Sequence, residues 1–309
     1  MEINAVFEGG GVRGISLAGA VEATERAGRT FKRVAGSSAG SIIATLLAAG
    51  FEGKEMSRII QGTSFTSFLK RGPIYNTAVI GPAARVLLKK GLYSGEAMES
   101  WIREILLNKG IVTFRDLPRG KLSIIASDIT NGRILVLPDG LEQYGISPDH
   151  FEVAKAVRMS CSIPYFFDPV RLRLNGQAAR GKSFTDQFVY IVDGGLLSNF
   201  PMWLFDGKDQ VNKSPEGRVP TVGYQLIGKT DPQPHQIRGP FSMLQAMVST
   251  MLSAHDERYI EQSKFVRTVK IPTLGIGTTQ FDITPDQSEA LYASGKKAGE
   301  DFFRDWRPR

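Results

Sequence analysis

A serine lies at the centre of a motif that can present a nucleophile. Residues Gly36-Ser37-Ser38-Ala39-Gly40 fit the pattern G-x-S-x-G, with an apolar segment before them and a helix-forming segment after them. The two glycines allow a sharp reversal of the chain, and the amino terminus of the following helix directs N–H groups towards an anion. The pattern predicts Ser38 at the tip of a strained turn, although an ordinary strand-to-helix turn in an α/β protein can use the same residues.

A glycine-rich segment follows the first apolar stretch of the chain. In Gly9-Gly10-Gly11-Val12-Arg13-Gly14, free backbone N–H groups could stabilise a developing oxyanion. The same glycines fit G-x-G-x-x-G, which makes a dinucleotide an alternative ligand. That alternative needs an acidic residue at the end of the second strand, where this chain has Gly36-Ser37-Ser38. We therefore favour oxyanion stabilisation over dinucleotide binding.

A serine nucleophile needs a base, and the chain has three histidines, His150, His235 and His255. His235 lies in a proline-rich stretch and His255 near the polar end of a methionine-lined helical pattern, so neither has the context of a catalytic histidine. A triad of Ser38, Asp193 and one histidine, in the order of the α/β-hydrolases, remains an alternative.

Asp193 is better placed than any histidine. It ends the apolar segment 188–192 and is followed by Gly194-Gly195. The carboxyl ends of strands are where active sites gather in α/β proteins. A turn aspartate beside glycine is the structural alternative for the same residues.

Strands and helices alternate at the start of the chain and position these residues. The hydrophobic pattern predicts a strand at 3–7, a helix at 15–27, a strand at 31–35 and a helix through Ala49. Strand character returns at 122–127, 133–137, 170–174 and 188–192. Such alternation predicts parallel βαβ units in a layered α/β domain.

Residues 51–117 interrupt this alternation. They contain helical patterns at 77–90 and 94–108 and no convincing strand, which predicts a helical insertion, or lid, over one edge of the sheet. We expect a single domain, 1–309, with residues 240–309 as a carboxyl-terminal helical elaboration.

The composition is that of an ordinary globular protein. Hydrophobic residues make up 42% and charged residues 22% of 309, which excludes a disordered, collagen-like or coiled-coil chain. The single cysteine, Cys161, cannot form an internal disulfide, and no Cys/His cluster predicts zinc. No apolar run approaches the roughly 20 residues that cross a bilayer, and Glu2 stands where a signal peptide carries positive charge. We expect a cytoplasmic protein.

The net charge of +7 is concentrated in one segment. Residues 54–119 hold 11 basic and 5 acidic residues, a local excess of +6. Anionic lipid, nucleic acid and solvent are the possible partners of such a charge. The segment also carries aromatic residues, namely Phe65, Phe68, Tyr75, Tyr93 and Trp101.

Taken together, these motifs resemble the patatin-like phospholipases, a family of lipid acyl hydrolases that use a Ser-Asp dyad. The likeness spans most of residues 3–205, is weakest over 51–117, and returns in the helical pattern of 280–303. The segments that carry it are Gly9–Gly14, Gly36–Gly40, 124–138, Arg158-Met159-Ser160-Cys161-Ser162-Ile163-Pro164, 166–170, Asp193-Gly194-Gly195 and Asn199-Phe200-Pro201.

The resemblance implies a three-layer α/β/α sandwich with a mostly parallel central sheet. Ser38 would attack an ester carbonyl, Asp193 would accept its proton, and water would release the acyl-Ser38 intermediate. The oxyanion hole would consist of N–H groups of Gly10, Gly11 and Val12, while Arg13 would hold the loop or contact a phosphate. No cofactor and no metal is implied. The supporting positions would be Gly9, Arg13, Gly14, Gly36, Gly40, Gly194 and Gly195.

The implied substrate is a phospholipid or another acyl-ester lipid, cleaved as by a phospholipase A. An acyltransferase or thioesterase using the same dyad is an alternative, and so is a non-enzymatic α/β protein that binds acyl chains or a nucleotide. A lipid substrate gives the basic segment a purpose, so we expect peripheral contact with an anionic membrane rather than with nucleic acid. The basic side chains expected at that contact are Lys70, Arg71, Arg85, Lys89 and Lys90.

Overall fold

The computed structural model describes residues 1–69, 90–206, 219–228 and 267–307, together with the single residues 237, 243, 246 and 250. The helix expected at 77–90 and most of the segment 240–309 before residue 267 lie outside these residues. So do four of the five basic residues expected at a membrane, all except Lys90.

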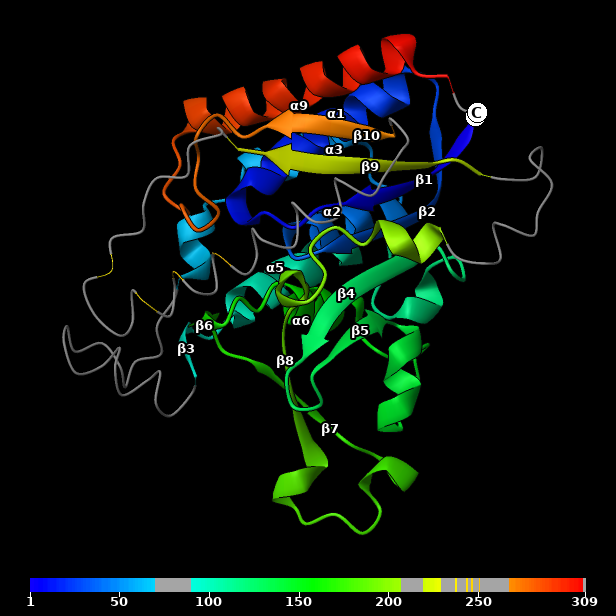
Figure 1. Cartoon of the computed structure of the whole chain (residues 1–309), viewed down its shortest axis with the longest axis vertical. Coiled ribbons are helices and arrows are strands. Elements are labelled where there is room, and N and C mark those ends of the chain that lie inside the picture. The colour runs from blue at the N-terminus through cyan, green and yellow to red at the C-terminus, as the bar shows by residue number, and fades with distance from the viewer. Residues whose placement is uncertain are drawn as a thin grey trace.

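Eight strands form one twisted sheet in the order β10-β9-β1-β2-β4-β8-β7, with β5 also paired to β4 (Figure 1). The pairings from β10 through β4 are parallel, and those of β4 with β5 and β8 and of β7 with β8 are antiparallel. The strands are β1 (Glu2–Phe7), β2 (Thr30–Ser37), β3 (Gly91–Tyr93), β4 (Leu122–Asp128), β5 (Arg133–Leu137), β6 (Tyr165–Phe167), β7 (Val170–Arg173), β8 (Phe188–Asp193), β9 (Thr221–Ile227) and β10 (Thr268–Pro272).

Both faces of the sheet are covered, which confirms the layered α/β architecture. Val6 of β1 and Ala35 of β2 pack with Met202 and Phe205 of a short 3-10 turn. The neighbouring residues of these strands belong to the main core with the helices, because successive side chains on a strand point to opposite faces. The helices are α1 (Ile15–Arg26), α2 (Ala39–Ala48), α3 (Gly53–Gln61), α5 (Glu96–Leu107), α6 (Val153–Ser160) and α9 (Pro285–Asp305).

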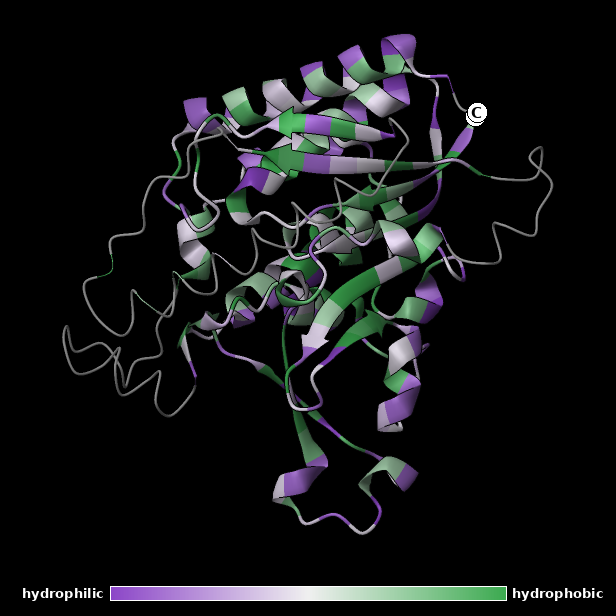
Figure 2. Cartoon of the chain, viewed as in Figure 1, coloured by the Kyte–Doolittle hydropathy of each residue, from purple (hydrophilic) through white to green (hydrophobic). Residues whose placement is uncertain are grey.

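Hydropathy explains why the strands occupy the interior. Five of the six residues of β1 are buried, and all of these but Asn4 are apolar, as expected of a central parallel strand. Figure 2 shows apolar residues running along β4 and β5, whereas hydrophilic and apolar residues alternate along α9. This pattern places α9 at the surface with one face towards the core.

Four strands, β3, β6, β9 and β10, were not predicted from the sequence. The segment 51–117, expected to have no strand, contains β3, which pairs in parallel with β6 through Gly91 and Tyr93. Three residues are too few for alternation to be visible, so the strand depends on its partner 70 residues away. The hydrophobic pattern predicted no strand where the structure has β9 and β10. These two strands extend the parallel sheet beyond β1.

The terminal helices α1 and α9 lie side by side, run in the same direction and touch at glycines (Figure 1). A β-carbon on Gly295 would lie 1.7 Å from the Ser16 carbonyl oxygen, and one on Gly19 would lie 2.1 Å from the Tyr292 carbonyl oxygen. Because backbone meets backbone on both sides, the contact cannot relax around a methyl group. Helix α9 therefore packs on α1 with backbone against backbone.

Gly295→Ala should lower the free energy of unfolding by about 2 kcal/mol, since the overpacked methyl outweighs the gain in helix propensity of roughly 1 kcal/mol. Urea denaturation followed by circular dichroism measures the change. Gly228→Ala is the control, because a β-carbon there meets nothing within 4 Å among the residues that the structure describes. Equal stability of Gly295→Ala and the wild type would contradict the close packing of α1 and α9.

Candidate active site

The edge of β4 brings together the ends of two strands that are far apart in sequence. Along this edge β2 pairs in parallel as far as Ser37 with Ile125, and β8 pairs antiparallel from Ala126 with Asp193. The opposite edge is taken by β5, which pairs with both Ile125 and Ala126. The last residue of β8 therefore lies next to the last residue of β2, and Ser38 follows directly.

Ser38 forms a strained turn between β2 and α2. Its backbone has φ 50° and ψ −128°, a conformation that is costly for a residue with a side chain. The turn is tight enough to require glycine on both sides. A β-carbon on Gly36 would lie 2.2 Å from the Gly40 carbonyl oxygen, and one on Gly40 would lie 2.3 Å from the Phe7 carbonyl oxygen.

The hydroxyl of Ser38 donates a hydrogen bond to the carboxylate of Asp193. The Oγ to Oδ2 distance is 2.7 Å, and the Gly195 N–H donates to Oδ1 at 2.8 Å. Ser38 is 7% exposed and Asp193 is 1% exposed. A β-carbon on Gly194 would lie 2.1 Å from the Ile125 carbonyl oxygen, so glycine is needed where the chain leaves β8.

Burial changes the acidity of this carboxyl group. Loss of hydration raises the pKa of Asp193 to about 7, and the hydrogen bonds from Ser38 and Gly195 oppose part of that rise. A carboxylate with a pKa near neutrality is a far better proton acceptor than one near 4. The pair can thus exchange a proton at neutral pH.

The carboxyl end of α6 holds both members of the pair in place. The Ser160 hydroxyl accepts the Ser38 N–H at 2.9 Å and donates to the Ile125 carbonyl oxygen, while the Asp193 N–H donates to the Ser162 carbonyl oxygen at 2.9 Å. The segment that contains Ser160 and Ser162 carries part of the family resemblance, but the sequence alone predicted no structural role for either serine. The run of small polar residues ahead of Pro164 is the local sequence feature that could have indicated such a role.

Asn199 fastens the glycine-rich loop to the same site. The Gly9 N–H donates to the Asn199 main-chain carbonyl oxygen at 3.1 Å, and the Asn199 side-chain amide donates to the Gly9 carbonyl oxygen at 3.3 Å. A β-carbon on Gly9 would lie 3.0 Å from the Ser38 Cβ, so this loop borders the serine. The sequence alone predicted no role for Asn199, because the hydrogen bond that links it to the glycine-rich loop joins residues 190 positions apart.

The N–H groups of the loop differ in what they bind. The Val12 N–H donates to the Thr278 carbonyl oxygen at 3.2 Å, so it is already engaged. The Gly10 and Gly11 N–H groups form no hydrogen bond among the residues that the structure describes. Arg13 donates from Nε to the Gly10 carbonyl oxygen at 3.1 Å, which supports the loop itself.

The remaining supporting glycine, Gly14, joins the loop to the nucleophile helix. A β-carbon on Gly14 would lie 2.9 Å from the Ala39 Cβ at the start of α2. Gly11 has φ +56°, a left-handed conformation that suits glycine. The sequence-predicted glycines therefore cluster around Ser38.

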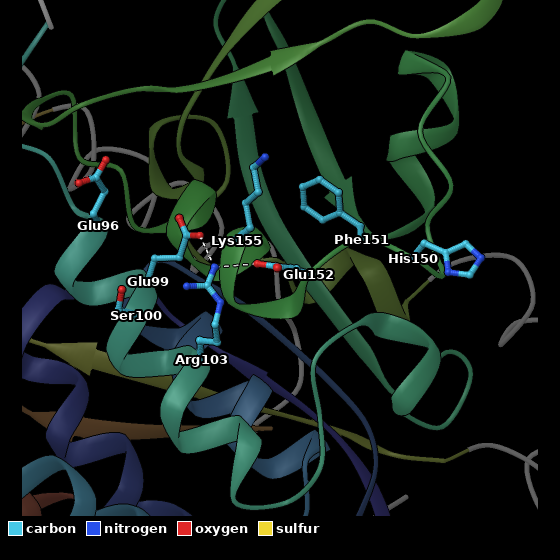
Figure 3. A pocket seen from close by; sticks show the side chains of 8 residues that line it. All are labelled: Glu96, Glu99, Ser100, Arg103, His150, Phe151, Glu152 and Lys155. Carbon is cyan, nitrogen blue, oxygen red and sulfur yellow. Dashed lines mark hydrogen bonds and ion pairs between the residues drawn. The ribbon is translucent and has the colours of Figure 1, made fainter.

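His150, the histidine that the described part of the chain contains, is not part of this cluster. His150 lines a separate surface pocket of about 750 Å³ between α5 and α6 (Figure 3). In that pocket Arg103 binds Glu99 at 2.8 Å and Glu152 at 2.7 Å. His235 and His255 lie outside the described residues. The Asp193 carboxylate oxygens accept hydrogen bonds from the Ser38 hydroxyl and the Gly195 N–H.

The structure yields two further observations on the described part of the chain. Its titratable and sulfur-bearing side chains form no group of three His, Cys, Asp or Glu suited to hold a metal ion. None of its helices is both long and apolar enough to cross a membrane.

Comparison with solved structures shows the same fold elsewhere. VipD from Legionella pneumophila superposes with a TM-score of 0.57 at 18% identity, and the type III effector ExoU with 0.50 at 16%. Each alignment covers 98% of this chain, but only 66% of the VipD chain and 53% of the ExoU chain. The chain thus matches about two-thirds and half of these larger proteins.

Comparison of sequences gives a closer relationship. The uncharacterized protein YqhO of Bacillus subtilis (strain 168) is 41% identical over 307 residues, which are 99% of either chain. The sequence model of the patatin-like phospholipases matches residues 5–206, the stretch that holds the glycine-rich loop, Ser38, Asp193 and Asn199. The chain belongs to the patatin-like phospholipase family.

Proposed function

We propose that the protein is a lipid acyl hydrolase that cleaves carboxylic esters with Ser38 as nucleophile and Asp193 as base. The observation that carries the proposal is the 2.7 Å hydrogen bond from the Ser38 hydroxyl to the buried carboxylate, on a turn with φ 50°. Family membership supports a lipid ester as substrate. A phospholipid, cleaved as by a phospholipase A, is the substrate we propose.

The reaction uses the two residues in turn. As the Ser38 oxygen attacks the ester carbonyl, its proton passes to Asp193 Oδ2, and the N–H groups of Gly10 and Gly11 stabilise the oxyanion. Collapse of the tetrahedral intermediate expels the alcohol, which takes the proton from Asp193. Water then attacks the acyl-Ser38 ester, gives a proton to Asp193 and releases the fatty acid as Ser38 regains that proton.

The rest of the chain has a supporting part in this proposal. We assign residues 1–309 to one domain, because α9, which lies outside the segment 5–206 that the family model matches, packs on α1 inside that segment. Residues 51–117 and 240–309 are its elaborations. We also propose that the enzyme acts at the surface of a membrane and uses no cofactor.

Ser38→Ala and Asp193→Asn should each lower kcat by about a thousandfold or more, because each removes one half of a pair that acts as a unit. Hydrolysis of a chromogenic short-chain ester measures the loss, and circular dichroism confirms folding. Ser37→Ala is the matched control, since the buried Ser37 hydroxyl has no hydrogen-bond partner in the described part of the chain. A folded variant that keeps more than about a tenth of the activity would refute the dyad.

Activity should fall below neutral pH. Asp193 must be ionised to accept the proton, and its pKa of about 7 means that kcat/KM declines about tenfold for each pH unit below that value. The test substrate is an ester without titratable groups, assayed from pH 5 to 9. A rate that stays level down to pH 5 would exclude a base with this pKa.

The histidines should be dispensable. Replacement of His150, His235 and His255 together by Gln should leave kcat within about tenfold of the wild type, because Asp193 takes the role of base. The same ester assay and the three single variants provide the measurement. Loss of activity in the folded triple variant, reproduced by one single variant, would assign the base to that histidine.

A further inference from the structure

The β7–β8 hairpin extends away from the body of the protein, at the end opposite α9 (Figure 1). Its strand pairing closes with Arg173 opposite Phe188, so residues 174–187 form the connection. Hairpin connections usually need only about 2–5 residues, and much longer ones generally serve a function. We name residues 171–188 the hairpin tip.

The hairpin tip exposes an aromatic side chain. Phe184 is 68% exposed, the largest fraction among the large hydrophobic side chains that the structure describes. Its ring contacts that of Phe188 edge-on, with 5.4 Å between centroids, so it is held in position by a neighbour. Beside the hairpin, the β4–β5 turn exposes Ile129 and Ile134, and the Ile129 N–H donates to the Tyr190 carbonyl oxygen of β8.

Basic side chains surround this aromatic residue. Four of them in the hairpin tip are exposed, and one acidic residue, Asp186, gives a net charge of +3 over 171–188. Asp186 accepts a hydrogen bond from the Ser183 hydroxyl at 2.6 Å. The four basic residues are Arg171, Arg173, Arg180 and Lys182.

Two arginines lie over the aromatic rings. The Arg171 guanidinium is 5.0 Å from the Phe188 ring centroid, and the Arg173 guanidinium is 5.8 Å from the Phe184 ring centroid. These contacts hold positive charge close to the exposed ring, at cation–π distance. Aromatic rings flanked by cations are suited to the interface of a membrane, where rings enter the headgroup layer and cations meet phosphates.

We propose that the hairpin tip is a docking element for an anionic lipid surface. Phe184 enters the headgroup region, and Arg180 and Lys182 bind lipid phosphates on either side of it. This surface differs from the predicted cluster around Arg85, which lies outside the described residues. The proposal rests on the proposed lipid hydrolase function for its purpose, but its binding step is independent of catalysis.

Docking there would fix the distance between the membrane and the dyad. Strand β8 leads from Phe188 at the hairpin tip to Asp193 at the site, a span of about 17 Å at roughly 3.4 Å per residue. Because β8 is paired along its whole length, with β7 from Phe188 to Ile191 and with β4 from Ile191 to Asp193, the strand is a stiff spacer. The hairpin tip should therefore matter for lipids in a bilayer and not for a soluble ester.

The test compares binding of full-length variants to vesicles of phosphatidylcholine with and without about a third of phosphatidylglycerol. The wild type should sediment with the anionic vesicles and be released by high salt. Arg180→Glu/Lys182→Glu should lower the partition coefficient about 30-fold or more, because each cation contributes roughly fivefold. Phe184→Ser should lower it about tenfold.

Matched controls lie outside the hairpin tip. Lys270→Glu/Lys297→Glu makes the same change in charge at exposed positions on β10 and α9, and Leu107→Ser removes an apolar side chain that is 52% exposed. Both should bind anionic vesicles as the wild type does. Equal loss in both double variants would mean that overall charge and not the hairpin tip drives binding, which would overturn the proposal.

The enzymatic arm separates this proposal from the proposed function. Variants of the hairpin tip should hydrolyse the soluble ester at the wild-type rate and vesicle phospholipid more slowly. No hydrolysis of any ester by the wild type would refute the proposed function while leaving vesicle binding as the test of docking. Wild-type binding to duplex DNA but not to anionic vesicles, lost in Arg180→Glu/Lys182→Glu, would assign the surface to nucleic acid and overturn the lipid proposal.

Discussion

The shared edge of β4 is the constraint on which the candidate site depends. Because β2 runs parallel and β8 antiparallel to β4, the two strands end facing each other at Ile125 and Ala126. A shift of the β8 register by one residue would turn the Asp193 side chain to the other face of the sheet. The contact of Ser38 with Asp193 is therefore a property of sheet pairing, and the hydroxyl and carboxylate need no flexible loop to find each other.

Burial of the Asp193 carboxylate lowers the free energy of unfolding when the group is ionised. Its folded-state pKa of about 7 lies above the value near 4 of an unfolded aspartate, so the folded protein holds the Asp193 proton more tightly. The resulting stabilisation is complete below about pH 4 and is lost as pH rises through 7, a change on the order of 4 kcal/mol. The fold must offset this cost elsewhere, and contacts such as the backbone packing of α1 on α9 contribute to doing so.

Close backbone packing recurs around the site and explains its glycines. Gly36, Gly40 and Gly194 stand where a β-carbon would meet a carbonyl oxygen at 2.3 Å or less. These contacts draw β1, β2, β4 and β8 together around the Ser38 turn. Asn199 then ties the Gly9 loop, whose N–H groups we propose as oxyanion donors, to the segment that follows Asp193. A rigid frame thus holds Ser38, Asp193 and the Gly9 loop in one place.

The amino-acid sequence by itself determined the features that depend on neighbours along the chain. The turn at Ser38, the glycine loop and the end of strand β8 at Asp193 could all be predicted, because glycine spacing and apolar runs act locally. Only the tertiary structure decided the roles of Ser160 and Asn199, the pairing of β3 with β6, and the engagement of Val12 by Thr278. These features join residues separated by many tens of positions, and no local pattern encodes which distant backbone group will meet which side chain.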